Sequence, residues 1–178
     1  MTRRSALVLL LIAGVAAMSA GIYVGRSDRQ ASGVVRPGQT ATTLLALTLP
    51  DMAGTEMPLA EWRGQLLIVN FWATWCAPCR EEMPEFVRLQ TEFGAKGLQF
   101  VGIAVDDADK VRQFAAEIGL NYPALIGGHG AMELSRTLGN RVMALPFTVI
   151  VSRDGRIAHT QLGPLKGDQL RSIVLKYI

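Results

Sequence analysis

The sequence contains little cysteine and little histidine, with two of each among its 178 residues. Domains that depend on disulfides for stability carry a larger share of cysteine, and metal sites gather several cysteine or histidine ligands. The two histidines, His129 and His159, lie far from both cysteines in the sequence. We therefore expect neither a disulfide scaffold nor a metal site.

The charged residues form no basic cluster. Lysine and arginine number 18 against 15 aspartates and glutamates, which gives a formal net charge of +3. These basic residues are scattered, without interleaved aromatic residues, whereas a nucleic-acid interface needs a concentrated basic surface. The composition predicts an ordinary solvated surface and no nucleic-acid partner.

Charge is absent from residues 6–24, which follow Arg3 and Arg4. At about 1.5 Å per residue, a helix of this length just crosses a hydrocarbon core of about 30 Å. The run also exceeds the apolar part of a cleaved signal peptide, roughly 7 to 15 residues. We predict an uncleaved signal anchor in residues 1–25 that holds the protein at the inner membrane, with its globular domain in the periplasm. Cleavage of this segment is the alternative.

Small and polar residues without periodicity make up residues 26–42, which we interpret as a flexible tether. A single domain is expected to follow, over residues 43–178. It begins with Leu45, Leu47 and Leu49 alternating with smaller residues, before a break at residues 50–54. This pattern predicts an N-terminal β-hairpin.

Strand and helix patterns alternate through the rest of the chain and end with a hairpin and a helix. This order predicts an α/β fold with a mixed sheet. An aspartate before the second helix, Asp106 or Asp107, is expected to cap it, and Pro84 is expected to kink the first. The predicted strands cover residues 66–71, 98–105, 122–126, 147–151 and 157–162, and the helices 79–93, 107–118, 131–138 and 167–177.

The two cysteines, Cys76 and Cys79, stand three positions apart where a strand pattern gives way to a helical one. At a helix start the first sulfur lies near unpaired backbone N–H groups and the positive end of the helix dipole, which favours the thiolate. Cys76 is therefore the predicted nucleophile toward a disulfide, and Cys79 the thiol that resolves the mixed disulfide. Pro78 suits the first helical turn because it has no N–H to leave unpaired.

The surrounding string, VNFWATWCAPCREEMP over residues 69–84, resembles the thioredoxin superfamily. Within it, the chain is similar to membrane-tethered thiol-disulfide oxidoreductases of the TlpA and ResA type, over roughly residue 43 to the end. The resemblance implies a thioredoxin-like fold with an N-terminal hairpin extension and a central helix-strand insertion. It also implies that the Cys76–Cys79 disulfide is the redox centre and that no other cofactor is needed.

The resemblance assigns roles to residues around the thiols. Asn70 stands where thioredoxin has a buried aspartate, and an amide cannot titrate. Glu82, at i+3 from Cys79 and on the same helical face, matches the glutamate of ResA-like proteins and is the expected proton partner of Cys79. An exposed helix carboxylate is the alternative reading of Glu82.

Substrate contacts also follow from the resemblance. Pro146 matches the cis-proline that lies opposite the thiols, and Leu145 before it would offer backbone hydrogen bonds to an extended substrate. Trp75 and Pro78 complete the expected substrate-binding surface. Trp72 has two readings, an active-site aromatic residue or a packing residue.

The resulting functional prediction is an enzyme that reduces protein disulfides outside the cytoplasm. Three kinds of substrate remain open: apocytochrome c, within cytochrome c maturation, a copper-site protein, and a general pool of misoxidised proteins. A membrane electron donor of the DsbD or CcdA kind would return the thiols to their reduced state.

Three alternatives use the same fold. An oxidant that introduces disulfides differs in reduction potential, which the sequence does not fix. A thiol peroxidase needs a P-x-x-x-[ST]-x-x-C pattern that neither cysteine has. A copper metallochaperone of Sco-like architecture uses a C-x-x-x-C pair, one residue longer than the spacing of Cys76 and Cys79.

Overall fold

The computed structural model describes residues 40–178. The predicted anchor at residues 1–25 and the tether up to residue 39 lie outside the described residues. Within the described part, no helix is both long enough and apolar enough to span a bilayer. Three residues assigned to the tether, residues 40–42, belong to the packed domain: Ala41 is buried and its N–H donates to the carbonyl of Gly155 at 2.9 Å.

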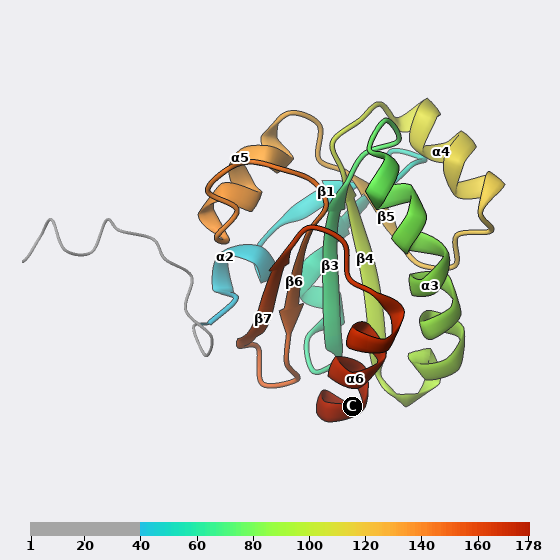
Figure 1. The fold of residues 1–178 in the computed structure, drawn as a ribbon. Coiled ribbons are helices and arrows are strands. Elements are labelled where there is room, and N and C mark those ends of the chain that lie inside the picture. The colour runs from blue at the N-terminus through green and yellow to red at the C-terminus, as the bar shows by residue number, and fades with distance from the viewer. Residues whose placement is uncertain (1–39) are drawn as a thin grey trace, which may run out of the picture. The chain divides into compact units, whose positions relative to one another are not determined.

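A five-stranded mixed sheet forms the centre of the domain (Figure 1), in the order β5-β4-β3-β6-β7. The strands β4 and β5 run parallel to β3, while β6 runs antiparallel to β3 and β7 antiparallel to β6. Their bounds are β3 Leu66–Trp72, β4 Leu98–Ala104, β5 Ala124–Ile126, β6 Phe147–Val151 and β7 Ile157–Leu162.

Helices cover both faces of the sheet, because alternate residues of the fully buried strand β3 point to opposite sides. Leu66 and Ile68 join a core with α3, α4 and α6, whereas Leu67 and Val69 join a second core with α2 and α5. The helices are α2 Thr42–Leu45, α3 Ala77–Phe93, α4 Ala108–Glu117, α5 Gly130–Thr137 and α6 Gly167–Tyr177. Two 3-10 turns accompany them, η2 Leu59–Trp62 and η3 Gly94–Lys96.

The predicted α/β fold is confirmed, including its two additions. The hairpin is formed by β1 Thr48–Pro50 and β2 Glu56–Pro58, and the insertion by α4 and β5 between β4 and α5. The bounds of β6, β7 and α6 match the prediction. Leu45 does not lie in the hairpin as predicted. It ends the short helix α2, because Leu44 and Leu45 both bury their side chains beside η2.

Two predictions about helices need correction or comment. Asp107 occupies the N-cap position of α4, but its side chain makes no capping hydrogen bond. It lies 79% exposed and pairs instead with Lys110 at 3.1 Å. Helix α3 is continuous through Pro84, which lies on its exposed side.

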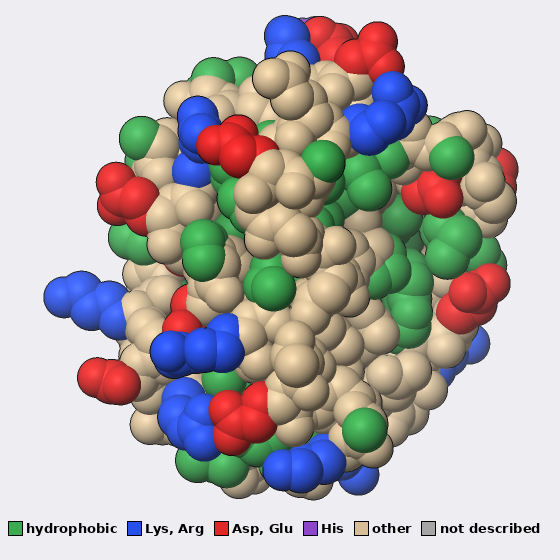
Figure 2. Space-filling view, turned by 90° about the vertical axis from the view of Figure 1, so that its right-hand side faces the viewer, with side chains coloured by type: hydrophobic (Ala, Val, Ile, Leu, Met, Phe, Trp, Pro, Cys, Tyr) green, Lys and Arg blue, Asp and Glu red, His purple; other side chains and the backbone are tan. Residues whose placement is uncertain are grey.

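Charges of both signs are interspersed on the face that α3 and α4 cover (Figure 2). Lysine and arginine side chains there lie next to aspartates and glutamates, with hydrophobic side chains between them. Ion pairs such as that of Arg80 with Glu117, at 3.5 Å, are exposed on both sides. Exposed pairs of this kind stabilise a fold by less than about 1 kcal/mol each.

Candidate active site

The disulfide lies where β3 ends and α3 begins, as the sequence predicts. Cys76 is the N-cap residue of α3, and its Sγ accepts the backbone N–H of Cys79 at 3.3 Å. The two sulfurs are bonded, with their Cα atoms 5.3 Å apart. Cys76 is 6% exposed and Cys79 is fully buried, so Cys76 is the more accessible of the two cysteines.

A buried polar network lies behind the disulfide. Glu82, 5% exposed, is on the same face of α3 as Cys79. The side-chain amide of Asn70 on β3 donates to Glu82 Oε1 at 2.9 Å and to Thr148 Oγ1 on β6 at 3.0 Å. The backbone N–H of Leu165 donates to Glu82 Oε2 at 2.8 Å. Both carboxylate oxygens therefore have a donor, which excludes the alternative of an exposed helix carboxylate.

Burial raises the pKa of Glu82 to about 7, from an ordinary value of 4.5, although the hydrogen bonds from Leu165 and Asn70 act in the opposite direction. Removing a carboxylate from water disfavours its charged form. At neutral pH this group is therefore divided between its protonated and ionised forms. It is equipped to take up and release a proton.

Pro146 follows a cis peptide bond after Leu145, as predicted. Its carbonyl accepts the N–H of Gly163 at 2.9 Å, and the next residue, Phe147, pairs with Phe71 in the sheet. This register places Pro146 at the end of the sheet where β3 passes into the cysteine loop. Leu145 is partly buried there and packs against both cores.

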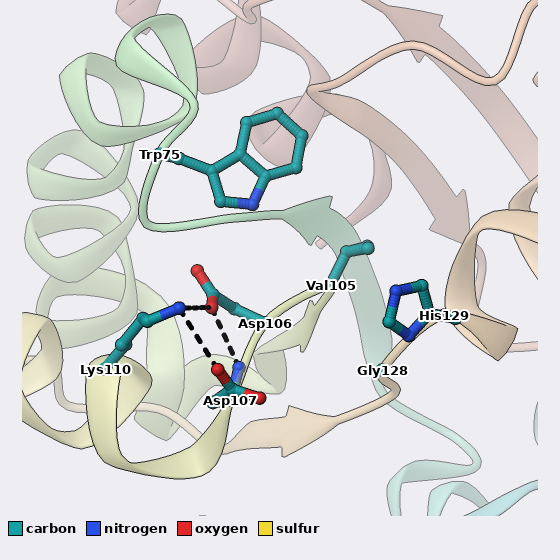
Figure 3. A pocket seen from close by; sticks show the side chains of 7 residues that line it. All are labelled: Trp75, Val105, Asp106, Asp107, Lys110, Gly128 and His129. Atoms are coloured by element: carbon teal, nitrogen blue, oxygen red, sulfur yellow. Dashed lines mark hydrogen bonds and ion pairs between the residues drawn. The ribbon is translucent and has the colours of Figure 1, made fainter.

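The two tryptophans of the motif have different surroundings. Trp72 is fully buried and packs on Phe114 at 5.6 Å between ring centres, which supports the packing reading. Trp75, directly before Cys76, is 68% exposed. Its indole lines a cavity of about 240 Å³, together with Asp106, Lys110 and His129 (Figure 3).

Asp106 holds the loop between Trp72 and Cys76, a contact that the sequence analysis missed. It accepts the backbone N–H of Thr74 at 3.2 Å and also the Thr74 hydroxyl. Lys110 lies 3.4 Å from the same carboxylate (Figure 3). The signal available in the sequence is position, because Asp106 follows β4 closely and the ends of neighbouring parallel strands meet at one edge of a sheet.

The sequence model of the Redoxin family matches residues 36–176. The chain belongs to the Redoxin family. Among its curated relatives is the thiol-disulfide oxidoreductase ResA of Bacillus cereus, 26% identical over 173 residues, which are 97% of this chain and 91% of that protein. The thioredoxin-like protein YneN of Bacillus subtilis is 32% identical over 161 residues, 88% of each chain.

Solved Redoxin-like structures share the fold. A thiol:disulfide interchange protein of the thioredoxin family from Chlorobium tepidum superposes with a TM-score of 0.71 at 25% identity, covering 80% of this chain and 97% of that one. A secreted thiol-disulfide isomerase from Corynebacterium glutamicum gives a TM-score of 0.68 at 25% identity, covering 74% and 83%.

This Redoxin protein is a thiol-disulfide oxidoreductase of the ResA type, which confirms the resemblance seen in the sequence. Residues 40–178 contain no group of three or more histidine, cysteine, aspartate or glutamate side chains suited to a metal ion. His129 is exposed at the cavity beside Trp75, while His159 lies on β7. The structure does not bring either histidine together with the cysteines into such a group.

Proposed function

We propose that the protein reduces disulfides of other proteins, with Cys76 as nucleophile, Cys79 as resolving thiol and Glu82 as the proton partner of Cys79. The observation that carries this proposal is the unequal burial of the two sulfurs, with a proton-exchanging carboxylate on the buried side. A substrate disulfide meets Cys76 first. Cys79 needs a base inside the domain, because water does not reach it.

The reaction proceeds in two exchanges. The Cys76 thiolate attacks a substrate disulfide, which breaks the substrate S–S bond, forms a mixed disulfide and releases one substrate thiolate. Glu82 then accepts the proton of the Cys79 thiol, and the Cys79 thiolate attacks Cys76 Sγ. The second substrate sulfur leaves as a thiolate and takes a proton from Glu82 or water, the Cys76–Cys79 disulfide forms, and two electrons have passed to the substrate.

Four residues are proposed to hold the substrate. The exposed Trp75 and the first-turn Pro78 flank Cys76, while Leu145 offers backbone groups for a short strand-like pairing next to Pro146. Support comes from their common position at one end of the sheet, next to the accessible sulfur. A substrate bound in this way is extended near its cysteine.

The proposed setting is the periplasmic side of the inner membrane, with residues 6–24 as the anchor. The secreted Corynebacterium relative supports a location outside the cytoplasm. The Cys76–Cys79 pair is the sole redox group in the proposal, so electrons must come from a membrane dithiol donor of the DsbD or CcdA kind. Apocytochrome c and copper-site proteins are the proposed substrates, and no nucleic acid takes part.

The deciding experiment is the equilibrium of the Cys76–Cys79 pair with glutathione. A reductant should have a potential near that of thioredoxin, about −270 mV, whereas strong oxidants lie near about −120 mV. A value near the oxidant end would reverse the direction of the proposed reaction. Stoichiometric Cu(I) binding without any disulfide exchange would instead support the metallochaperone alternative.

A further inference from the structure

A tight turn immediately before Leu145 exposes two apolar side chains. Val142 is 69% exposed and Met143 is 43% exposed. Met143 also has a backbone φ of +52°, in the left-handed region that non-glycine residues rarely adopt. Apolar exposure and a strained backbone both cost free energy, so a function of this turn would explain why the chain adopts it.

A buried amide holds the turn in place. Asn140 is 1% exposed, and its side chain pairs with both backbone groups of Ala144: Nδ2 donates to the Ala144 carbonyl at 2.8 Å, and Oδ1 accepts the Ala144 N–H at 3.1 Å. Nδ2 also donates to Ser135 Oγ on α5, at 3.0 Å. The N–H of Met143 closes the turn on the Asn140 carbonyl at 3.0 Å.

These bonds tie the turn to the frame of the domain. Ser135 is fully buried and its hydroxyl in turn donates to the carbonyl of Met132, so the amide is anchored to α5. On the other side, Ala144 leads through Leu145 into Pro146 and β6. The turn is therefore a fixed part of the edge at which Cys76 lies.

Exposed apolar residues concentrate at this edge of the described domain. The described residues include five exposed large hydrophobic side chains. Of these, Trp75 precedes Cys76, and Leu162 pairs with Phe147 at the start of β6. Val142 and Met143 precede Leu145, and the fifth, Leu175, lies on α6. Four of the five thus belong to segments that meet at the disulfide end of the sheet.

We propose that the turn held by Asn140 is a specificity surface, on which Val142 and Met143 bind an apolar side chain located about two residues from the reacting cysteine of a protein substrate. Asn140 acts as a positioning residue. The inference rests on the proposed function, because it extends the substrate segment that pairs with Leu145.

The spacing follows from chain geometry. An extended substrate advances about 3.3 Å per residue, so a side chain two positions from its cysteine lies about 7 Å along the strand. Met143 is two residues from Leu145, and its Cα therefore lies at most about 7 Å from that of Leu145. The Met143 side chain is therefore within reach of that substrate position when the substrate cysteine lies beside Leu145.

The test uses the full-length chain in detergent and peptides whose single cysteine forms a mixed disulfide with a chromogenic thiol. The peptides differ only in the residue two positions from the cysteine. This residue is leucine in one peptide and glutamine in the other. We expect kcat/KM to favour the leucine peptide about fivefold, the effect of burying about one methylene group. Equal rates for the two peptides would overturn the inference.

Polar variants of the turn provide the matched comparison. Val142→Thr and Met143→Gln keep the side-chain size and should together reduce the preference to less than twofold. Leu175→Gln, the control, removes an equally exposed apolar side chain from α6 and should keep the fivefold preference. A preference that survives the turn variants, or that falls in the control, would contradict the assignment.

Asn140→Ala tests the positioning role. It should raise KM for the leucine peptide more than for the glutamine peptide, and so lower the leucine preference to less than twofold, because a loosened turn weakens the contact with the apolar side chain. An equal loss with both peptides would show a purely structural role. If this variant fails to fold, the turn variants decide the question.

The two proposals fail in different ways. If the wild-type protein reduces both peptides at one rate, the reductase function stands and the specificity surface is wrong. If it fails to reduce them but oxidises two-cysteine peptides that carry leucine or glutamine at the same position, with the same leucine preference, the reductase direction is wrong and the surface stands.

Discussion

The two sides of the disulfide have contrasting environments. Behind Cys79, the polar atoms of Glu82 each have a defined partner, from Asn70 on one strand and Leu165 in a distant loop. In front of Cys76, Trp75 and the turn of Val142 and Met143 are exposed. In the proposed mechanism, one group handles the proton on the buried side, whereas several residues of small individual effect contact the substrate on the exposed side.

The largest expected effect comes from the disulfide that separates the two sides. Cys76→Ser should reduce exchange to the uncatalysed background, because it removes the accessible sulfur. Cys79→Ser should still attack once and then accumulate a mixed disulfide with substrate. Intact-protein mass measurement after mixing with a disulfide peptide distinguishes the two variants. If Cys76→Ser instead accumulated the adduct, the assignment of the two thiols would be reversed.

On the buried side, Glu82→Gln should slow resolution of the mixed disulfide about 10²- to 10³-fold at neutral pH, in the range of general acid-base catalysis. The wild-type rate should change across a pH near the Glu82 pKa of about 7, and the variant should lose that step. Stopped-flow mixing over a pH series measures both. Glu81→Gln, on the exposed neighbouring residue, is the control, and an unchanged profile in Glu82→Gln would remove the assigned role.

The same group predicts how stability depends on pH. Glu82 has a pKa of about 7 in the folded protein against about 4.5 unfolded, so the folded state binds more protons between these values. The free energy of unfolding should therefore fall by about 3 kcal/mol as the pH rises from about 4.5 to about 7. Urea unfolding of the oxidised protein at several pH values tests this. Glu82→Gln should flatten the slope, and an equally steep slope in that variant would assign it to other groups.

Asp106 lies on the same side of the disulfide as Trp75, yet its side chain is only 4% exposed. Burial opposes its ionisation, yet hydrogen bonds from Thr74, the Asp107 N–H and Lys110 hold the pKa below its usual value. Asp106→Asn should cost about 1 to 3 kcal/mol in the free energy of unfolding at neutral pH, the range for hydrogen bonds to charged groups.

The stabilising contribution of Asp106 is present above the unfolded pKa and is lost as the pH falls through the lowered folded pKa. The cost of Asp106→Asn should therefore shrink in acid. Asp107→Asn, on a carboxylate that is 79% exposed, should change stability by less than about 0.5 kcal/mol. A similar loss of stability in both variants would mean that stability depends on negative charge near α4 and not on the hydrogen bonds from Thr74 to Asp106.

The sequence predicts those parts of the site that depend on local order. Cys76 at a strand-helix junction, Glu82 one turn beyond Cys79, and Pro146 before a strand all follow from neighbours in the chain and from the resemblance. The Leu165–Glu82 and Asp106–Thr74 hydrogen bonds join residues that are 83 and 32 positions apart. Such contacts depend on how distant loops pack against the cysteine loop and α3. The periodicity of the sequence carries no information about this packing.

Errors in the prediction have the same origin. A four-residue helix such as α2 has no period to detect, so the alternation of Leu45, Leu47 and Leu49 predicts a strand from Leu45, which instead ends a helix. Asp107 has the residue type and position of a cap, but its side chain pairs with Lys110 and accepts no hydrogen bond from the backbone of α4. Asn140 gave no signal at all, because its role depends on the two backbone groups of Ala144 that the fold brings to it.

The smallest expected effect is on the exposed side, and it separates function from stability. Trp75→Ala should change the free energy of unfolding by no more than about 0.5 kcal/mol, because the indole is 68% exposed. Trp72→Ala, three residues earlier and fully buried, should cost about 3 to 5 kcal/mol. Denaturant unfolding of both variants makes the comparison. If Trp75→Ala were nearly as destabilising as Trp72→Ala, the exposed side would be part of the core, and weaker reaction with protein substrates could no longer be attributed to lost contact.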